Sequence, residues 1–123
     1  MQFARSLARR AREDLDALRV LHERGGIADA VVGFHAQQAV EKALKSAIVA
    51  AGGHLRRTHD LRFLIEQAED LRIQLSAPLA EAAWLTPWAV ELRYDEYLEE
   101  ELDRDRAVRA VVAAVEMVER QIP

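Results

Sequence analysis

Glycine and proline interrupt this 123-residue chain at four internal places and leave long uninterrupted segments between them. The interruptions are the pairs Gly25-Gly26 and Gly52-Gly53 and the single prolines Pro78 and Pro87. The segments are rich in Ala, Leu, Arg and Glu, which are strong helix formers, and none shows the apolar–polar alternation that indicates a strand. We therefore predict an all-α fold, an antiparallel up-and-down bundle of four to five helices.

The spacing of the apolar residues gives the approximate positions of these helices. Repeats of three and four residues predict helices over about residues 3–24, 27–51 and 103–121. Two more are expected between the last two of these, one with Thr58 as its N-cap and one from about residues 76–78 until Pro87 kinks or ends it. Residues 27–51 carry apolar side chains on two sides, including a broad alanine-rich arc. This pattern predicts a central helix that another helix approaches closely.

The length of the chain allows one hydrophobic core but not two full domains, so we expect residues 1–123 to form a single domain. The absence of cysteine excludes a disulfide framework, a thiolate zinc site and a cysteine nucleophile. No apolar stretch approaches the ~20 residues that span a membrane, and no apolar h-region follows the arginines near residue 10, so we expect no signal peptide. We predict a cytoplasmic protein without membrane association.

The net charge of −4 is unevenly distributed along the chain. Residues 95–106 contain seven acidic and two basic side chains, and the rest of the chain has one more base than acids. The acidic balance therefore does not exclude a ligand that carries phosphate.

The histidines do not have the spacing of a metal site. Carboxylate-bridged metal pairs in helical bundles use Glu-x-x-His sequences on two helices, and none of the four histidines has Glu three residues before it. HExxH and EF-hand patterns are absent, and the glycine pairs are interhelical breaks rather than phosphate-binding loops. We predict no metal and no cofactor.

Four polar residues gather on one face of the helix over residues 27–51. His35, Gln38, Lys42 and Lys45 lie within about 80° of one another around the helix axis. One interpretation is a face that binds a ligand. The other is that Gln38 makes a buried hydrogen bond while the two lysines lie in water.

Residues 54–62 combine three arginines and two histidines with the expected start of a helix. Free N–H groups at a helix N-terminus attract anions, and arginine adds bidentate recognition of phosphate. Arg56, Arg57, His59 and Asp60 are therefore candidate ligand-binding residues. The alternative is that His59 and Asp60 cap or brace the helix.

The pair Arg93-Tyr94 follows the break at Pro87. In one interpretation Arg93 is anchored to a carboxylate, with Tyr94 packed beside it. In the other the pair contacts a nucleotide, with Arg93 on a phosphate and Tyr94 stacked on a base.

These segments, in this order, resemble the HEPN domain family. The resemblance rests on Phe34-His35-Ala36-Gln37-Gln38-Ala39-Val40-Glu41-Lys42-Ala43-Leu44-Lys45, followed by Gly52, Thr58-His59-Asp60-Leu61 and Arg93-Tyr94. It covers nearly the whole chain. It implies an antiparallel helical bundle that often forms a homodimer, a role in binding nucleotide or RNA, and frequent partnership with a minimal nucleotidyltransferase, as in toxin–antitoxin pairs.

Many HEPN relatives are metal-independent ribonucleases whose motif, by this resemblance, is an Arg followed a few positions later by His. Arg93 matches that Arg, but Tyr97, Leu98 and Glu99 stand where the His is required, and no histidine follows His59. Since proton transfer near neutral pH needs a group such as histidine, we predict a binding module without catalytic residues. The alternatives are a ribonuclease with a degenerate motif, using Arg93 and His59, and a purely structural homodimer. The candidate ligand-binding residues are His35, Gln38, Lys42, Lys45, Arg56, Arg57, His59, Asp60, Arg93 and Tyr94.

Overall fold

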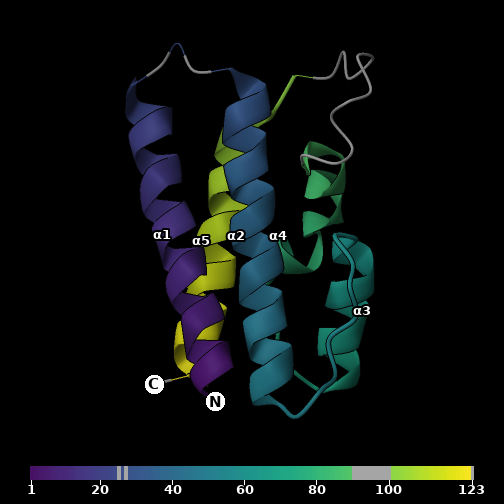
Figure 1. Ribbon diagram of the computed structural model, residues 1–123. Helices are drawn as coiled ribbons and strands as arrows, with labels where there is room; N and C mark the ends of the chain where they lie inside the picture. The colour runs from purple at the N-terminus through teal and green to yellow at the C-terminus, as the bar shows by residue number, and fades with distance from the viewer. Residues whose placement is uncertain (25, 27, 90–100, 123) are drawn as a thin grey trace.

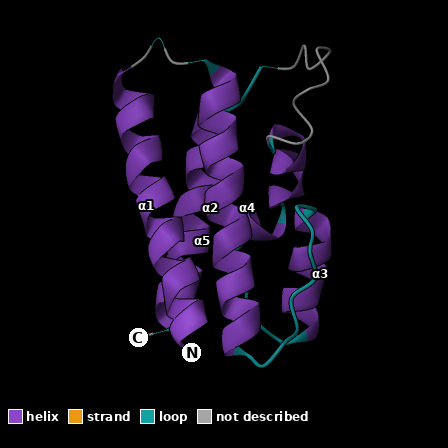
Figure 2. Cartoon of the chain, viewed as in Figure 1, coloured by secondary structure: helices purple, strands orange, loops and turns teal. Residues whose placement is uncertain are grey.

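The computed structural model describes residues 1–24, 26, 28–89 and 101–122, and every regular element in these ranges is helical. The elements are α1 (Gln2–Arg24), α2 (Asp29–Ala50), α3 (Leu61–Asp70), the short α4 (Ala77–Ala80), the 3-10 helix η1 (Ala82–Trp88) and α5 (Arg104–Gln121). They pack side by side as a bundle (Figure 1), and Figure 2 shows helices and loops only in the described ranges. The predicted all-α bundle is confirmed. None of the described helices is long and apolar enough to span a membrane.

Ion pairs between α1 and α5 define the relative direction of these two helices. Arg12 Nε donates to Glu119 Oε1 over 2.9 Å, which joins the first half of α1 to the end of α5. At the other end, His22 lies 3.6 Å from Asp105, in the first turn of α5. The two helices are therefore antiparallel, and Figure 1 shows that α2 is antiparallel to α1 as well.

α2 is the central helix of the bundle. It contacts α1, α3, η1 and α5, with α1 and α5 on one side and α3 and η1 on the other (Figure 1). The small residues of its alanine-rich arc are completely buried: Ala36, Ala39, Ala43 and Ala47. The predicted central position is confirmed, because only a helix with neighbours on several sides buries so much of its circumference.

The connection from α2 to α3 turns back along α2 instead of crossing to the far end of the bundle. Gly52 adopts a φ of 86°, which favours glycine and closes the end of α2. A Cβ on Gly53 would lie 2.9 Å from Leu71, just beyond α3, while His59, just before α3, contacts Glu41 in the middle of α2. α2 and α3 therefore run in the same direction.

The start of α3 is capped by Asp60, so the N-cap predicted at Thr58 is wrong. The Asp60 carboxylate accepts a hydrogen bond of 3.0 Å from the Arg62 N–H. The Thr58 hydroxyl instead accepts a hydrogen bond of 3.0 Å from the N–H of Asp60, the residue just before the helix. Both side chains are good caps, and the backbone position of the first helical turn decides between them.

The end of α3 has the same hydrogen-bond pattern as the end of α2 but an arginine at the left-handed position. Arg72 has a φ of 63°, a conformation that costs a non-glycine residue about 1 kcal/mol or more. We expect Arg72→Gly to raise the free energy of unfolding by up to about 1 kcal/mol, measured by urea denaturation. The matched change Gly52→Ala should lower it by a similar amount, since its Cβ would meet no atom within 4 Å and only the strain would count. An unchanged stability in both variants would contradict the prediction.

η1 docks on α2 through Trp88. Ring atoms of Trp88 lie 2.5–2.9 Å from the position that a Cβ on Gly33 would take, a separation that real side chains do not tolerate. The indole therefore lies directly on the backbone of α2. Pro87 is inside η1, which ends at the next residue, as predicted for a proline that kinks or ends a helix.

Asp29, in the first turn of α2, holds the chain where it enters α5. Its carboxylate accepts hydrogen bonds from the Leu102 N–H (3.1 Å) and from Arg104 Nε (2.8 Å). The Leu102 N–H and the charge and hydrogen bond of Arg104 lower the pKa of Asp29 below its ordinary value of 3.8, although partial burial opposes them. The charged form is therefore the one that the folded state stabilises.

This pKa gives a prediction about acid stability. Because the pKa is lower in the folded state, Asp29 contributes stability at every pH above about 3.8, and the contribution is lost as the pH falls through the folded-state value. We expect Asp29→Asn to be less stable than the wild type at pH 6 by about 1 kcal/mol. The difference should shrink as the pH falls below 3.8, measured by urea denaturation between pH 6 and pH 2.5. A difference that grows on acidification would contradict this sign.

Candidate functional site

The first part of the candidate site joins α1 to the exposed face of α2 through Asp14. The Asp14 carboxylate lies 2.8 Å from Lys42 Nζ and 3.2 Å from His35 Nδ1. Lys42 and His35 lie two turns apart on one side of α2, so a single acid can contact both. We call these three residues the Asp14 cluster.

The second part lies where α2 faces the segment before α3. Glu41 is only 7% exposed, and its carboxylate accepts hydrogen bonds from Lys45 Nζ (3.1 Å), His59 Nδ1 (2.7 Å) and Gln37 Nε2 (2.9 Å). Gln38 Nε2 donates in turn to Gln37 Oε1 over 2.7 Å. We call these five residues the Glu41 cluster.

The structure thus divides the four polar residues of this face between two groups: His35 and Lys42 share Asp14, while Gln38 and Lys45 belong with His59 to the Glu41 cluster. Gln38 makes a partly buried hydrogen bond, as the structural interpretation of this face predicts. The same interpretation is wrong about the lysines, because both are ion-paired and only 24% and 17% exposed. An ammonium that is paired on one side and partly exposed on the other remains able to donate to a ligand.

N–H groups at the start of α3, which could bind an anion, already donate to side chains of the chain itself. The N–H of Leu61 donates to the Thr86 hydroxyl over 3.1 Å, and that of Arg62 donates to the Asp60 carboxylate. Asp60 is therefore a cap, and its negative charge lies where an anion would approach. His59 turns toward Glu41.

The two arginines of the segment before α3 are exposed, and neither belongs to the Asp14 cluster or the Glu41 cluster. Arg56 places its guanidinium over the ring of Phe63, 5.7 Å from the ring centre. Arg57 is exposed to solvent. Arg93 and Tyr94 lie outside the described residues, so their predicted contacts with a carboxylate or a nucleotide remain predictions.

The family model for the HEPN domain matches residues 4–121. This chain belongs to the HEPN domain family. Neither the curated proteins nor the solved structures gave a significant match. The match covers both clusters, the whole of α2 and α5 and all but the first two residues of α1, so the resemblance seen in the sequence is confirmed.

The sequence interpretation of this HEPN domain missed the acids and the amide that organise the site. Glu41 and Gln37 carried a signal, because Gln37, Glu41 and Lys45 follow one another at the four-residue spacing of helical neighbours. Asp14 carried none. It belongs to α1, and only the packing of α1 on α2 brings it to Lys42.

The clusters can do two things chemically. Each of the two carboxylates, Glu41 buried and Asp14 partly buried, holds a lysine and a histidine in position at the surface, so less conformational entropy is lost when a ligand binds to them. In addition, a histidine whose Nδ1–H donates to a carboxylate carries its lone pair on Nε2 when neutral, which is the arrangement used for proton transfer. The first property suits phosphate binding and the second suits acid–base chemistry.

Proposed function

We propose that this HEPN domain binds a phosphate-bearing ligand, a nucleotide or a segment of RNA, on the exposed face of α2. The observation that carries the proposal is the placement of Lys42 and Lys45, the only two lysines of the chain, each held by a largely buried acid. Lysine is a compact charge with three N–H donors that commonly binds phosphate. Holding both ammonium groups on one helix face prepares them for the same ligand.

We also propose that the protein acts as a cytoplasmic homodimer and as the partner of a minimal nucleotidyltransferase, in a pair of the toxin–antitoxin kind. Membership of the HEPN family supports this partnership. A nucleotidyltransferase gene beside the gene for this chain, and co-elution of the two purified proteins in size-exclusion chromatography, would support the pairing. Separate elution of the two proteins would count against it.

The lysine pair gives a direct test of the binding site. Purified protein is treated with an amine-reactive label with and without millimolar ATP, and the labelled positions are read by mass spectrometry. ATP should slow the labelling of Lys42 and Lys45 at least severalfold. Titration calorimetry should give a saturable Kd below about 1 mM, which corresponds to about −4 kcal/mol, and Lys42→Ala and Lys45→Ala should each weaken it by about tenfold.

The control is an added lysine on another surface. Arg109 is exposed on α5, so Arg109→Lys supplies an amine whose labelling ATP should not change. Equal labelling of all three lysines with and without ATP would reject the nucleotide-binding proposal. If His59→Ala lowers the melting temperature and leaves ATP binding unchanged, the Glu41 cluster is structural, as in the structural-homodimer alternative.

A ribonuclease is the second candidate, and the hydrogen bond of 2.7 Å between His59 and Glu41 favours it. A carboxylate that orients a histidine is the usual arrangement of a general base. This candidate predicts metal-independent cleavage of RNA, abolished by His59→Ala or Arg93→Ala. RNA that stays intact after long incubation at low salt in the presence of EDTA would reject it.

A further inference from the structure

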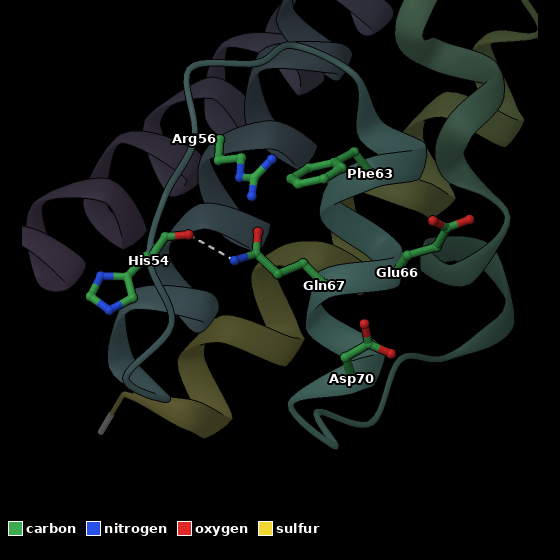
Figure 3. A pocket seen from close by; sticks show the side chains of 6 residues that line it. All are labelled: His54, Arg56, Phe63, Glu66, Gln67 and Asp70. Carbon is green, nitrogen blue, oxygen red and sulfur yellow. Dashed lines mark hydrogen bonds between the residues drawn. The ribbon is translucent and has the colours of Figure 1, made fainter.

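A hollow of about 350 Å³ lies outside the two clusters, between the segment that follows α2 and the outer face of α3. Figure 3 shows it with the side chains that line it. These residues are His54, Arg56, Phe63, Glu66, Gln67 and Asp70. Of these, only Arg56 belongs to the ligand-binding residues considered above.

One wall of the hollow carries a cation–π pair. The guanidinium of Arg56 lies over the ring of Phe63, at 5.7 Å from its centre, and both side chains reach into the space between the segment and α3 (Figure 3). A guanidinium beside an aromatic ring gives a surface on which a further planar ring can stack. Its charge also repels any cation that would enter.

The rest of the lining consists mainly of hydrogen-bond acceptors. Glu66 and Asp70 are one helical turn apart, exposed, and form no ion pair with the described residues. Gln67 Nε2 donates to the His54 carbonyl over 2.8 Å, while Gln67 Oε1 is buried and has no hydrogen-bond partner among the described residues. An acceptor left in this state costs about 1–3 kcal/mol until a donor reaches it.

The charges of the lining are mixed and match no simple ion completely: Glu66 and Asp70 repel an anion, and Arg56 repels a cation. A neutral planar ring with N–H donors satisfies both walls, because it stacks on Arg56 and donates to the acceptors. We propose that the hollow binds a nucleobase that carries an exocyclic amine, from a free nucleotide or from RNA. This inference rests on the proposed function and adds to it the kind of base that the protein would select.

Nucleosides test the hollow separately from any phosphate site. Cytidine and uridine have the same size and differ at the base edge, where cytidine offers an amine to carboxylates and uridine offers a carbonyl oxygen. Two-dimensional NMR titration of the ¹⁵N-labelled protein should give a Kd about tenfold lower for cytidine than for uridine. The side-chain amide of Gln67 should shift on cytidine binding.

Two variants separate the parts of the hollow. Glu66→Ala combined with Asp70→Ala should remove the preference for cytidine and leave uridine binding unchanged. Arg56→Ala should weaken both nucleosides by a similar factor, because it removes the stacking surface. The matched control is Glu69→Ala, since Glu69 is an exposed acid of α3 that lines a different hollow, and it should leave both affinities unchanged.

The outcomes separate the two proposals. Equal affinity for cytidine and uridine, or a preference that survives loss of Glu66 and Asp70, would overturn the base-binding inference. ATP protection of the lysines together with equal nucleoside affinities would leave the proposed function standing and reject the hollow. A preference for cytidine that depends on Glu66 and Asp70 supports the inference. If cytidine monophosphate slows the labelling of Lys42 and Lys45 and cytidine does not, the base and the phosphate are bound by different residues.

Discussion

Replacing Glu41 by alanine is expected to lower the free energy of unfolding by about 3 kcal/mol, measured by urea denaturation at pH 7. The buried carboxylate accepts from Lys45, His59 and Gln37 at 2.7–3.1 Å. Its removal leaves the buried Gln37 amide with only a long hydrogen bond of 3.5 Å to the His59 carbonyl, and the Lys45 charge without its counter-ion. The loss should lie at the lower end of the range for a broken buried ion pair, because Lys45 and His59 are partly exposed and can turn to water.

Two further variants show whether the loss comes from this carboxylate. Glu41→Gln keeps the volume and one acceptor oxygen, so it should cost roughly half as much. Glu116→Ala removes an exposed glutamate on α5 and should change stability by less than about 0.5 kcal/mol. Equal effects of Glu41→Ala and Glu116→Ala would contradict the assignment of Glu41 as the centre of its cluster.

Replacing Gly33 by alanine is expected to lower the free energy of unfolding by about 2 kcal/mol, again measured by urea denaturation. In the middle of an exposed helix the same change would stabilise by up to about 1 kcal/mol, because alanine is the better helix former. Here the added methyl would lie 2.5–2.9 Å from ring atoms of Trp88. The indole or the helix has to move, and both are packed in the core.

A double-mutant comparison isolates this contact. In a Trp88→Ala background the space above Gly33 is open, so Gly33→Ala should become neutral or stabilising by up to about 1 kcal/mol. A change of sign between the two backgrounds is the expected result. The same destabilisation in both backgrounds would show that the cost does not come from Trp88.

The helices were predicted closely because their signals are local. The long helices were expected over about residues 3–24, 27–51 and 103–121, and they are Gln2–Arg24, Asp29–Ala50 and Arg104–Gln121. Glycine and proline marked the breaks, since they act on the backbone of their own residues. The cap of α3 was misplaced by two residues because Thr58 and Asp60 are both suitable caps.

The site was predicted only in part, because local spacing shows which residues share a helix face but not which distant residues they contact. His35, Gln38, Lys42 and Lys45 share one face by helical geometry alone, and that grouping is visible in the sequence. Their partners were less visible. Asp14 reaches Lys42 across 28 positions of the chain, and His59 reaches Glu41 across 18.

By itself the sequence determined the helical class, the extent of the helices, the polar face of the second helix and the membership of the HEPN family, because these depend on composition and on spacing within short segments. The tertiary structure decided the rest. It set the parallel course of α3 beside α2, the fit of Trp88 on Gly33, and the two acids that hold the lysines and histidines. These depend on how separate helices pack, and contacts between distant segments leave no periodic pattern in a single sequence.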